Sequence, residues 1–101
     1  MSKGVVFWQI GGENNMKFIG ALIKEQGQVF AIAMVKPNVI SNVANREMLR
    51  NQISVLFEGV PVVLAEEKQG GRLLYNGRTD IVNFLSKLLP SQIPWKEYTL
   101  N

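Results

Sequence analysis

The sequence contains neither cysteine nor histidine. It therefore has no thiolate nucleophile, disulfide, imidazole base or Cys/His zinc site, which removes the commonest catalytic and metal chemistries. An enzyme built on this chain would have to work with Glu, Lys, Arg, Tyr, Ser or Thr, and we find no carboxylate pair or lysine in a recognisable catalytic setting. We predict a non-catalytic protein without cofactor or metal.

Long apolar runs and blocks of one charge are also missing. No apolar run approaches the roughly 18 residues of a membrane span, and the first residues lack a signal-peptide pattern. The 11 Lys+Arg and 8 Asp+Glu give a net charge of +3, but the cations are spread along the whole chain. A nucleic-acid binder usually concentrates them on one stripe. The sequence thus predicts a cytoplasmic protein with no membrane contact, for which nucleic acid is at most a weak, salt-sensitive partner.

What the chain does have is enough apolar sequence for one core. With 101 residues, 47% of them hydrophobic, it is too short for two independent cores and too hydrophobic to remain disordered. We expect a single domain over residues 1–101. Its tail, residues 90–101, is too apolar to be free and should pack on the domain or on a partner, because it carries Ile93, Trp95, Tyr98 and Leu100.

Apolar, β-branched runs predict strands at residues 5–10, 29–35, 61–65 and 72–75. The run 29–35 has no polar alternation, which is typical of a central strand covered on both faces. The glycines 70–71 make a turn, so the last two strands form a hairpin. Helices are predicted from Asn42 or Asn45 to Phe57, ending before Gly59, and from a Thr79 cap to Pro90.

Residues 15–26 decide the topology. Wound as a helix, this segment gathers its larger apolar side chains on one arc, whereas as a strand it mixes lysine with apolar residues on both faces. We therefore predict a helix that ends near Gly27, although Gly20 is unfavourable inside it. The alternative is a strand that turns at Gln26-Gly27 and pairs with residues 29–35.

With the helix, the fold class is α/β, in the order βαβαββα, with a mixed four-stranded sheet and helices on both faces. With the strand, it is an α+β fold made of two ββα repeats and a wholly antiparallel sheet.

The first order resembles the thioredoxin fold, and most closely the glutaredoxins and the N-terminal domains of glutathione transferases. The resemblance spans roughly residues 5–89 and rests on the element order and two short motifs. Val60-Pro61 looks like the Val-Pro element of that family, which implies a cis proline whose preceding backbone pairs with a bound peptide or glutathione. Gly77, Arg78, Thr79 and Asp80 stand where the family binds the γ-glutamyl end of glutathione.

The chain departs from that family at the redox site. Where a Cys-x-x-Cys pair would open the first helix, it has Glu13, Asn14, Asn15 and Met16, and a thioether forms no mixed disulfide. A Glu-Ser pair typical of glutathione transferases is replaced by Gly77-Arg78. The resemblance therefore implies a redox-dead scaffold that meets its partners through the loop 11–15 and the turns 60–61 and 77–80.

Each candidate also has a plain structural interpretation. Glu66 and Glu67 point to opposite faces of a strand and are best explained as solvated hairpin charges. Asp80 suits the start of a helix without any ligand, and Arg78 could receive a carboxylate or phosphate but is more simply a surface residue. Trp95 and Tyr98 fit an interface and a docked tail equally well.

The sequence thus predicts a non-catalytic protein-binding or regulatory module whose partner is another protein or a second copy of the chain. A small-ligand carrier or sensor of the glutathione type is the alternative, and weak nucleic-acid binding is a further one.

Overall fold

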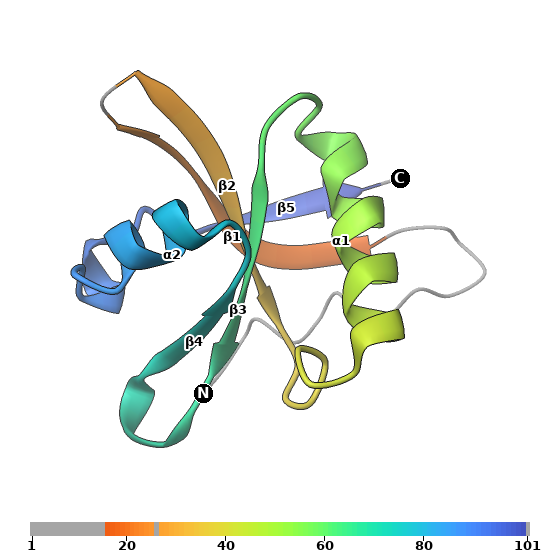
Figure 1. Cartoon of the computed structure of the whole chain (residues 1–101). Helices are drawn as coiled ribbons and strands as arrows, with labels where there is room; N and C mark the ends of the chain where they lie inside the picture. The colour runs from red at the N-terminus through yellow and green to blue at the C-terminus, as the bar shows by residue number, and fades with distance from the viewer. Residues whose placement is uncertain (1–15, 26, 101) are drawn as a thin grey trace.

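The computed structural model describes residues 16–25 and 27–100, so the strand predicted at 5–10 and the candidate residues Glu13, Asn14 and Asn15 lie outside the described part. Within these residues, five strands and two α-helices follow one another (Figure 1). They are β1 (Met16–Glu25), β2 (Gln28–Val35), α1 (Val43–Leu56), β3 (Val62–Glu67), β4 (Leu73–Asn76), α2 (Thr79–Leu85) and β5 (Lys96–Leu100), with short 3₁₀ turns η2 (Gln69–Gly71) and η3 (Pro90–Gln92).

The strands form one mixed sheet in the order β4-β3-β2-β1-β5. Strands β2 and β3 run parallel, and each of the other neighbouring pairs is antiparallel. The apolar run 29–35 lies in β2 at the centre of the sheet, with both faces covered, which confirms its prediction from the missing polar alternation. Three of the five described strands were predicted, and the other two are β1, from the segment predicted as a helix, and β5, from the tail.

The helix predicted over residues 15–26 is wrong. Residues Met16–Glu25 form β1, which pairs with β2 from Gly20↔Ala33 to Glu25↔Gln28, and Gly27 adopts a positive φ of 81° in the turn. The buried face of β1 changes at Gly20: Phe18 is buried before it, and Ala21 and Ile23 are buried after it, while Leu22 and Lys24 are exposed. Neither face of the strand is therefore apolar along its whole length. Phe18 lies in one hydrophobic cluster, and Ala21 and Ile23 lie in the other.

This strand changes the order of elements. The described chain reads ββα twice, with β1, β2 and α1 followed by β3, β4 and α2, and β5 completes the sheet. That is the order of the α+β alternative, but the sheet is mixed because β2 and β3 are parallel. The thioredoxin-like order βαβαββα is not confirmed, since a hairpin stands where its first helix would be.

Gly20 is the residue at which β1 changes partner. Residues 16–20 pair with β5, and residues 20–25 pair with β2. A Cβ atom at Gly20 would lie 2.5 Å from the carbonyl oxygen of Ile32 and 3.0 Å from a ring carbon of Phe18. The glycine therefore lets the β2 backbone and an aromatic ring approach β1 at the same point.

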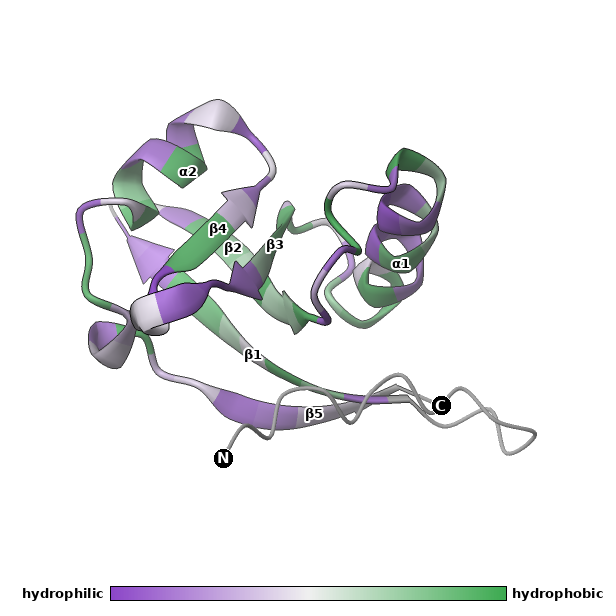
Figure 2. Ribbon diagram, turned by 90° about the horizontal axis from the view of Figure 1, so that it is seen from below, coloured by the Kyte–Doolittle hydropathy of each residue, from purple (hydrophilic) through white to green (hydrophobic). Residues whose placement is uncertain are grey.

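The two helices lie on opposite faces of the sheet, as predicted (Figure 2). Helix α1 packs over a cluster that contains Phe18, Ala31, Ala33, Val35, Ile40, Leu49, Ile53, Phe57, Val62 and Leu64. Helix α2 packs over a cluster that contains Ala21, Ile23, Phe30, Ile32, Val63, Ala65, Ile81, Leu85 and Ile93. Along β2 and β3, the alternation of side chains sends successive residues to the two clusters.

Helix α1 has the predicted boundaries, and α2 is shorter than predicted. The side chain of Asn42 caps α1 by accepting a hydrogen bond of 3.0 Å from the amide of Asn45, and Gly59 takes a positive φ of 77° after the helix. Helix α2 ends at Leu85 instead of near Pro90. Thr79 is its first residue rather than its cap, because the capping position is held by Arg78 without a side-chain bond to the helix. None of the described helices is long and apolar enough to cross a membrane.

Candidate functional site

The structure brings two of the predicted binding segments together. Val60-Pro61 leads into β3, and residues 77–80 lead from β4 into α2. Because β3 and β4 are antiparallel, with Leu64 opposite Asn76, the start of β3 and the end of β4 lie at the same end of the sheet. Gly77 packs so closely that a Cβ atom there would lie 2.8 Å from Cγ2 of Val63.

The Val60-Pro61 segment is used inside the fold. Val60 packs against both hydrophobic clusters, and the carbonyl oxygen of Pro61 accepts a hydrogen bond of 2.9 Å from the amide of Ala31. The described residues contain no cis peptide bond, so the cis proline implied by the thioredoxin resemblance is wrong. The carbonyl oxygen of Pro61 therefore already has a hydrogen-bond partner in β2.

Arg50 ties α1 to the same end of the sheet. Its Nη1 donates to the carbonyl oxygens of Val62, at 2.8 Å, and Asn76, at 3.2 Å, while Nη2 donates to the side-chain oxygen of Asn76. Its Nε and Nη2 also donate to Glu47, and Glu47 accepts a further bond of 2.9 Å from Arg46. These bonds from Arg50 and then from Arg46 lower the pKa of Glu47. All five donors of the Arg50 guanidinium are engaged, so it holds elements together rather than receiving an anion.

Arg78 and Asp80 form an exposed, two-pronged ion pair. The Arg78 Nε donates to Oδ1 of Asp80 at 2.9 Å, and Nη2 donates to Oδ2 at 2.7 Å. The Arg78 side chain lowers the pKa of Asp80 to about 2, so Asp80 is ionised at neutral pH. The guanidinium that the sequence offered to a carboxylate or phosphate ligand therefore already has a carboxylate partner within the chain.

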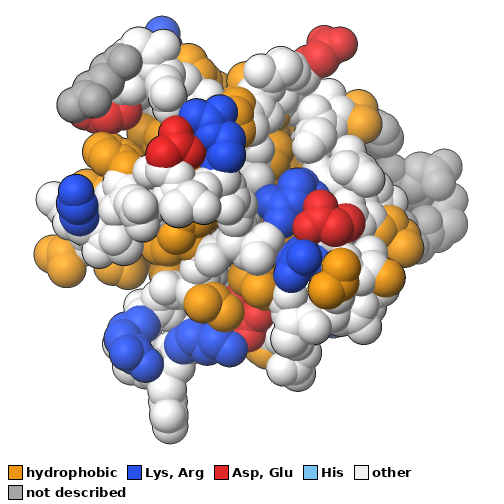
Figure 3. Space-filling view, in the orientation of Figure 1, with side chains coloured by type: hydrophobic (Ala, Val, Ile, Leu, Met, Phe, Trp, Pro, Cys, Tyr) orange, Lys and Arg blue, Asp and Glu red, His pale blue; other side chains and the backbone are white. Residues whose placement is uncertain are grey.

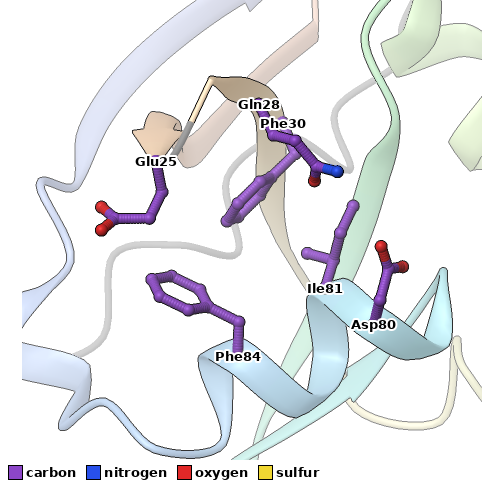
Figure 4. Close-up of a pocket in the computed structure, with 6 residues that line it drawn as sticks. All are labelled: Glu25, Gln28, Phe30, Asp80, Ile81 and Phe84. Carbon is purple, nitrogen blue, oxygen red and sulfur yellow. The ribbon is translucent and has the colours of Figure 1, made fainter.

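Asp80 also lines a pocket between the β1–β2 hairpin and α2 (Figure 4). The pocket has a volume of about 220 Å³ and is lined by Glu25, Gln28, Phe30, Asp80, Ile81 and Phe84. The rings of Phe30 and Phe84 meet edge to face, with centroids 6.0 Å apart. In Figure 4 these rings lie between the Glu25 carboxylate on one side and the Asp80 carboxylate on the other. No local signal in the sequence indicates this pocket, because its walls come from segments far apart in the chain.

Trp95 and Tyr98 lie on opposite faces of the sheet. The Trp95 Nε1 donates to the carbonyl oxygen of Pro90 at 2.9 Å, and its ring packs with the cluster under α2. Tyr98 stacks on Phe18 with centroids 5.5 Å apart and meets Phe57 edge to face at 5.1 Å under α1. Both aromatic residues therefore pack within the fold, and they do not form a common surface.

Helix α1 has an uncharged outward face. Met48 and Val55 stand seven residues apart, two turns along the helix, and are 58% and 72% exposed. Figure 3 shows apolar side chains over α1, next to a group of charged ones. The charged residues of α1 are Arg46, Glu47 and Arg50, which are bonded to one another on the flank that faces β3 and β4. The exposed face of a surface helix usually carries such charges instead.

A buried carboxylate holds the loop between β2 and α1. Glu66 is 2% exposed, and its Oε2 accepts bonds from Lys68 Nζ at 2.8 Å and from the amide of Asn38 at 3.3 Å. Asn38 adopts a positive φ of 76° there. Glu66 is therefore not the solvated charge expected from the sequence, whereas Glu67 on the other face is exposed.

We expect Glu66→Gln to lower the free energy of unfolding by about 1 kcal/mol at pH 7, since it removes a charged hydrogen bond from a buried position. Burial alone would raise the pKa of Glu66, but the bonds from Lys68 and Asn38 outweigh it and the pKa is lowered from 4.5. A lowered folded-state pKa stabilises the fold above the unfolded value and ceases to do so as pH falls through the folded value. Urea unfolding at a series of pH values should show the two proteins converging in acid. Glu67→Gln is the control, and an equal loss there would contradict the role of Glu66.

Among residues 16–25 and 27–100, no group of three or more Asp or Glu side chains is arranged to hold a metal ion. Comparisons with protein-family models, with curated proteins and with solved structures find no match for this chain.

Proposed function

We propose that this protein is a non-catalytic protein-binding module, and that it docks through the outward face of α1. The observation that carries the proposal is the pair Met48 and Val55, exposed and aligned on a helix face without charge. Leu56 is also exposed near the end of the helix. Burying large apolar side chains is favourable, and these are left in water. A protein partner that covers them would therefore gain this burial free energy.

The partner that fits this face is a second copy of the chain. In a two-fold dimer each surface meets itself, so a patch of one charge repels its own copy. The outward face of α1 avoids that repulsion because it interleaves apolar side chains with the neutral amides of Asn45, Asn51 and Gln52. An amide both donates and accepts hydrogen bonds, so such a face is complementary to itself. Two antiparallel α1 helices would place Met48 of one copy near Val55 of the other.

The dimer should be weak. A helix of 14 residues is about 21 Å long, which supports an interface at the small end of the range for specific complexes. We expect a dissociation constant on the order of 100 µM.

Sedimentation equilibrium over a range of concentrations tests the proposal. The unmodified protein should pass from monomer to dimer, and Met48→Glu with Val55→Glu should remain monomeric, because four carboxylates, two from each copy, would meet and be desolvated at the two-fold contact. Val43→Glu is the matched control, since Val43 is an exposed apolar residue of the same helix about 140° around from Met48. A strictly monomeric protein at millimolar concentration, or a dimer that survives the double substitution, would show that α1 does not dock a second copy.

The other two functions considered from the sequence find less support in the described residues. A glutathione-like ligand is anionic, and Arg78 is already paired with Asp80 beside a pocket that carries a second carboxylate, Glu25. For nucleic acid, Arg46, Arg50, Lys68 and Arg78 are each bonded to a carboxylate.

A further inference from the structure

We propose that the pocket between the β1–β2 hairpin and α2 binds an organic dication, namely a linear alkyl diamine. This inference does not depend on the proposed dimer, because the pocket lies on the α2 face of the sheet and α1 lies on the other. The pocket has an apolar middle and a carboxylate at each end, and a diamine has the complementary pattern.

The middle of the pocket matches a chain of methylene groups. Phe30 and Ile81 are 3% and 2% exposed, so little of either is open to solvent outside the pocket floor, and the Phe84 ring closes the floor edge to face against Phe30. The volume of about 220 Å³ is below the range of drug-sized sites, which favours a short, narrow ligand. A methylene chain laid on these side chains leaves water without losing a hydrogen bond.

The ends of the pocket match two ammonium groups. Glu25 comes from the end of β1 and Asp80 from the first turn of α2, and Figure 4 shows the two carboxylates on either side of the phenylalanine rings. Asp80 remains ionised at neutral pH, and the Gln28 side chain offers an amide oxygen between the elements. With Arg78 included, the three charged groups sum to −1 in a protein of net charge +3. A monoamine would satisfy one end only.

Arg78 is the natural competitor of the ligand. It occupies both oxygens of Asp80, but the pair is exposed, and exposed ion pairs are weak and easily shared. An incoming ammonium group can therefore bind Asp80 beside Arg78 or displace it. Removing the Arg78 charge should strengthen diamine binding rather than weaken it.

The experiment is an NMR titration of the full-length ¹⁵N-labelled protein with diaminobutane, diaminopentane and diaminohexane, and with butylamine as the monoamine. We expect a dissociation constant on the order of 1 mM for the best diamine, at least about tenfold tighter than butylamine. The amide shifts should be concentrated at Gln28, Phe30, Ile81 and Phe84. Equal binding of butylamine, or shifts spread over the whole surface, would overturn the proposal.

Substitutions test whether diamine binding depends on the pocket or on the net charge of the protein. Glu25→Gln and Asp80→Asn should each weaken diamine binding about threefold, and Arg78→Gln should strengthen it about threefold. The matched controls are Glu97→Gln on β5 and Arg72→Gln beside η2, which make the same changes in net charge away from the pocket. If the controls change the affinity as much as the pocket variants do, binding is non-specific and the proposal fails.

Discussion

Replacing Phe18 by alanine is expected to lower the free energy of unfolding by about 3–5 kcal/mol, the range found for large aromatic residues removed from a core. Phe18 is 1% exposed, and its ring meets Tyr98 and Phe57. It therefore connects β1 to β5 and to the residue that ends α1. The substitution would leave a cavity where three elements meet, and this part of the fold has little means to collapse into it.

Urea unfolding followed by circular dichroism measures this loss. Phe18→Leu is the informative comparison, because it keeps most of the volume and should lose clearly less than the alanine variant. Leu22→Ala, in the same strand but about half exposed, should cost less than about 1 kcal/mol. If Phe18→Ala were as mild as Leu22→Ala, the aromatic cluster would not be a main source of stability.

Gly20→Ala is expected to cost about 2–3 kcal/mol, although alanine usually favours folding by restricting the unfolded chain. The added Cβ atom would lie 2.5 Å from the carbonyl oxygen of Ile32, which is backbone and belongs to the central strand β2. The two strands must separate to admit it.

The same unfolding assay tests Gly20→Ala in a Phe18→Leu background. The smaller side chain removes the second close contact, with the Phe18 ring, but leaves the one with Ile32. Most of the loss should therefore persist. Full recovery in that background would mean that the Phe18 ring, and not the β2 backbone, is what Gly20 accommodates.

Local signals in the sequence were sufficient for much of the fold. The unbroken apolar run of β2 indicated a central strand, and Asn42 marked the start of α1 by its capping chemistry. Residues 16–25 were different, because their apolar residues satisfy a helical arc as well as a strand whose buried face changes at Gly20. Strand pairing and the close approach at Gly20 settle the choice, and both depend on residues far along the chain.

The candidate sites, too, depend on contacts between residues that are far apart in the sequence. The sequence placed Arg78 and Asp80 correctly at the start of α2, but it could not show that they bind each other in a two-pronged pair. The sequence around Arg50 gives no sign of its acceptors Val62 and Asn76, which lie 12 and 26 residues away in the chain. The pocket combines Glu25 with Asp80, and the sequence around one of these residues does not indicate the other.

Because β1 pairs with different strands before and after Gly20, hydrogen exchange along this one strand measures two separate opening reactions. Its first half is held by the terminal strand β5, and its second half by β2 in the middle of the sheet. Detachment of β5 would expose the amides before Gly20 to solvent deuterium. The amides after Gly20 would exchange only when β1 and β2 separate. Protection against exchange along this single strand is thus set by two different free energies, with the boundary at one glycine.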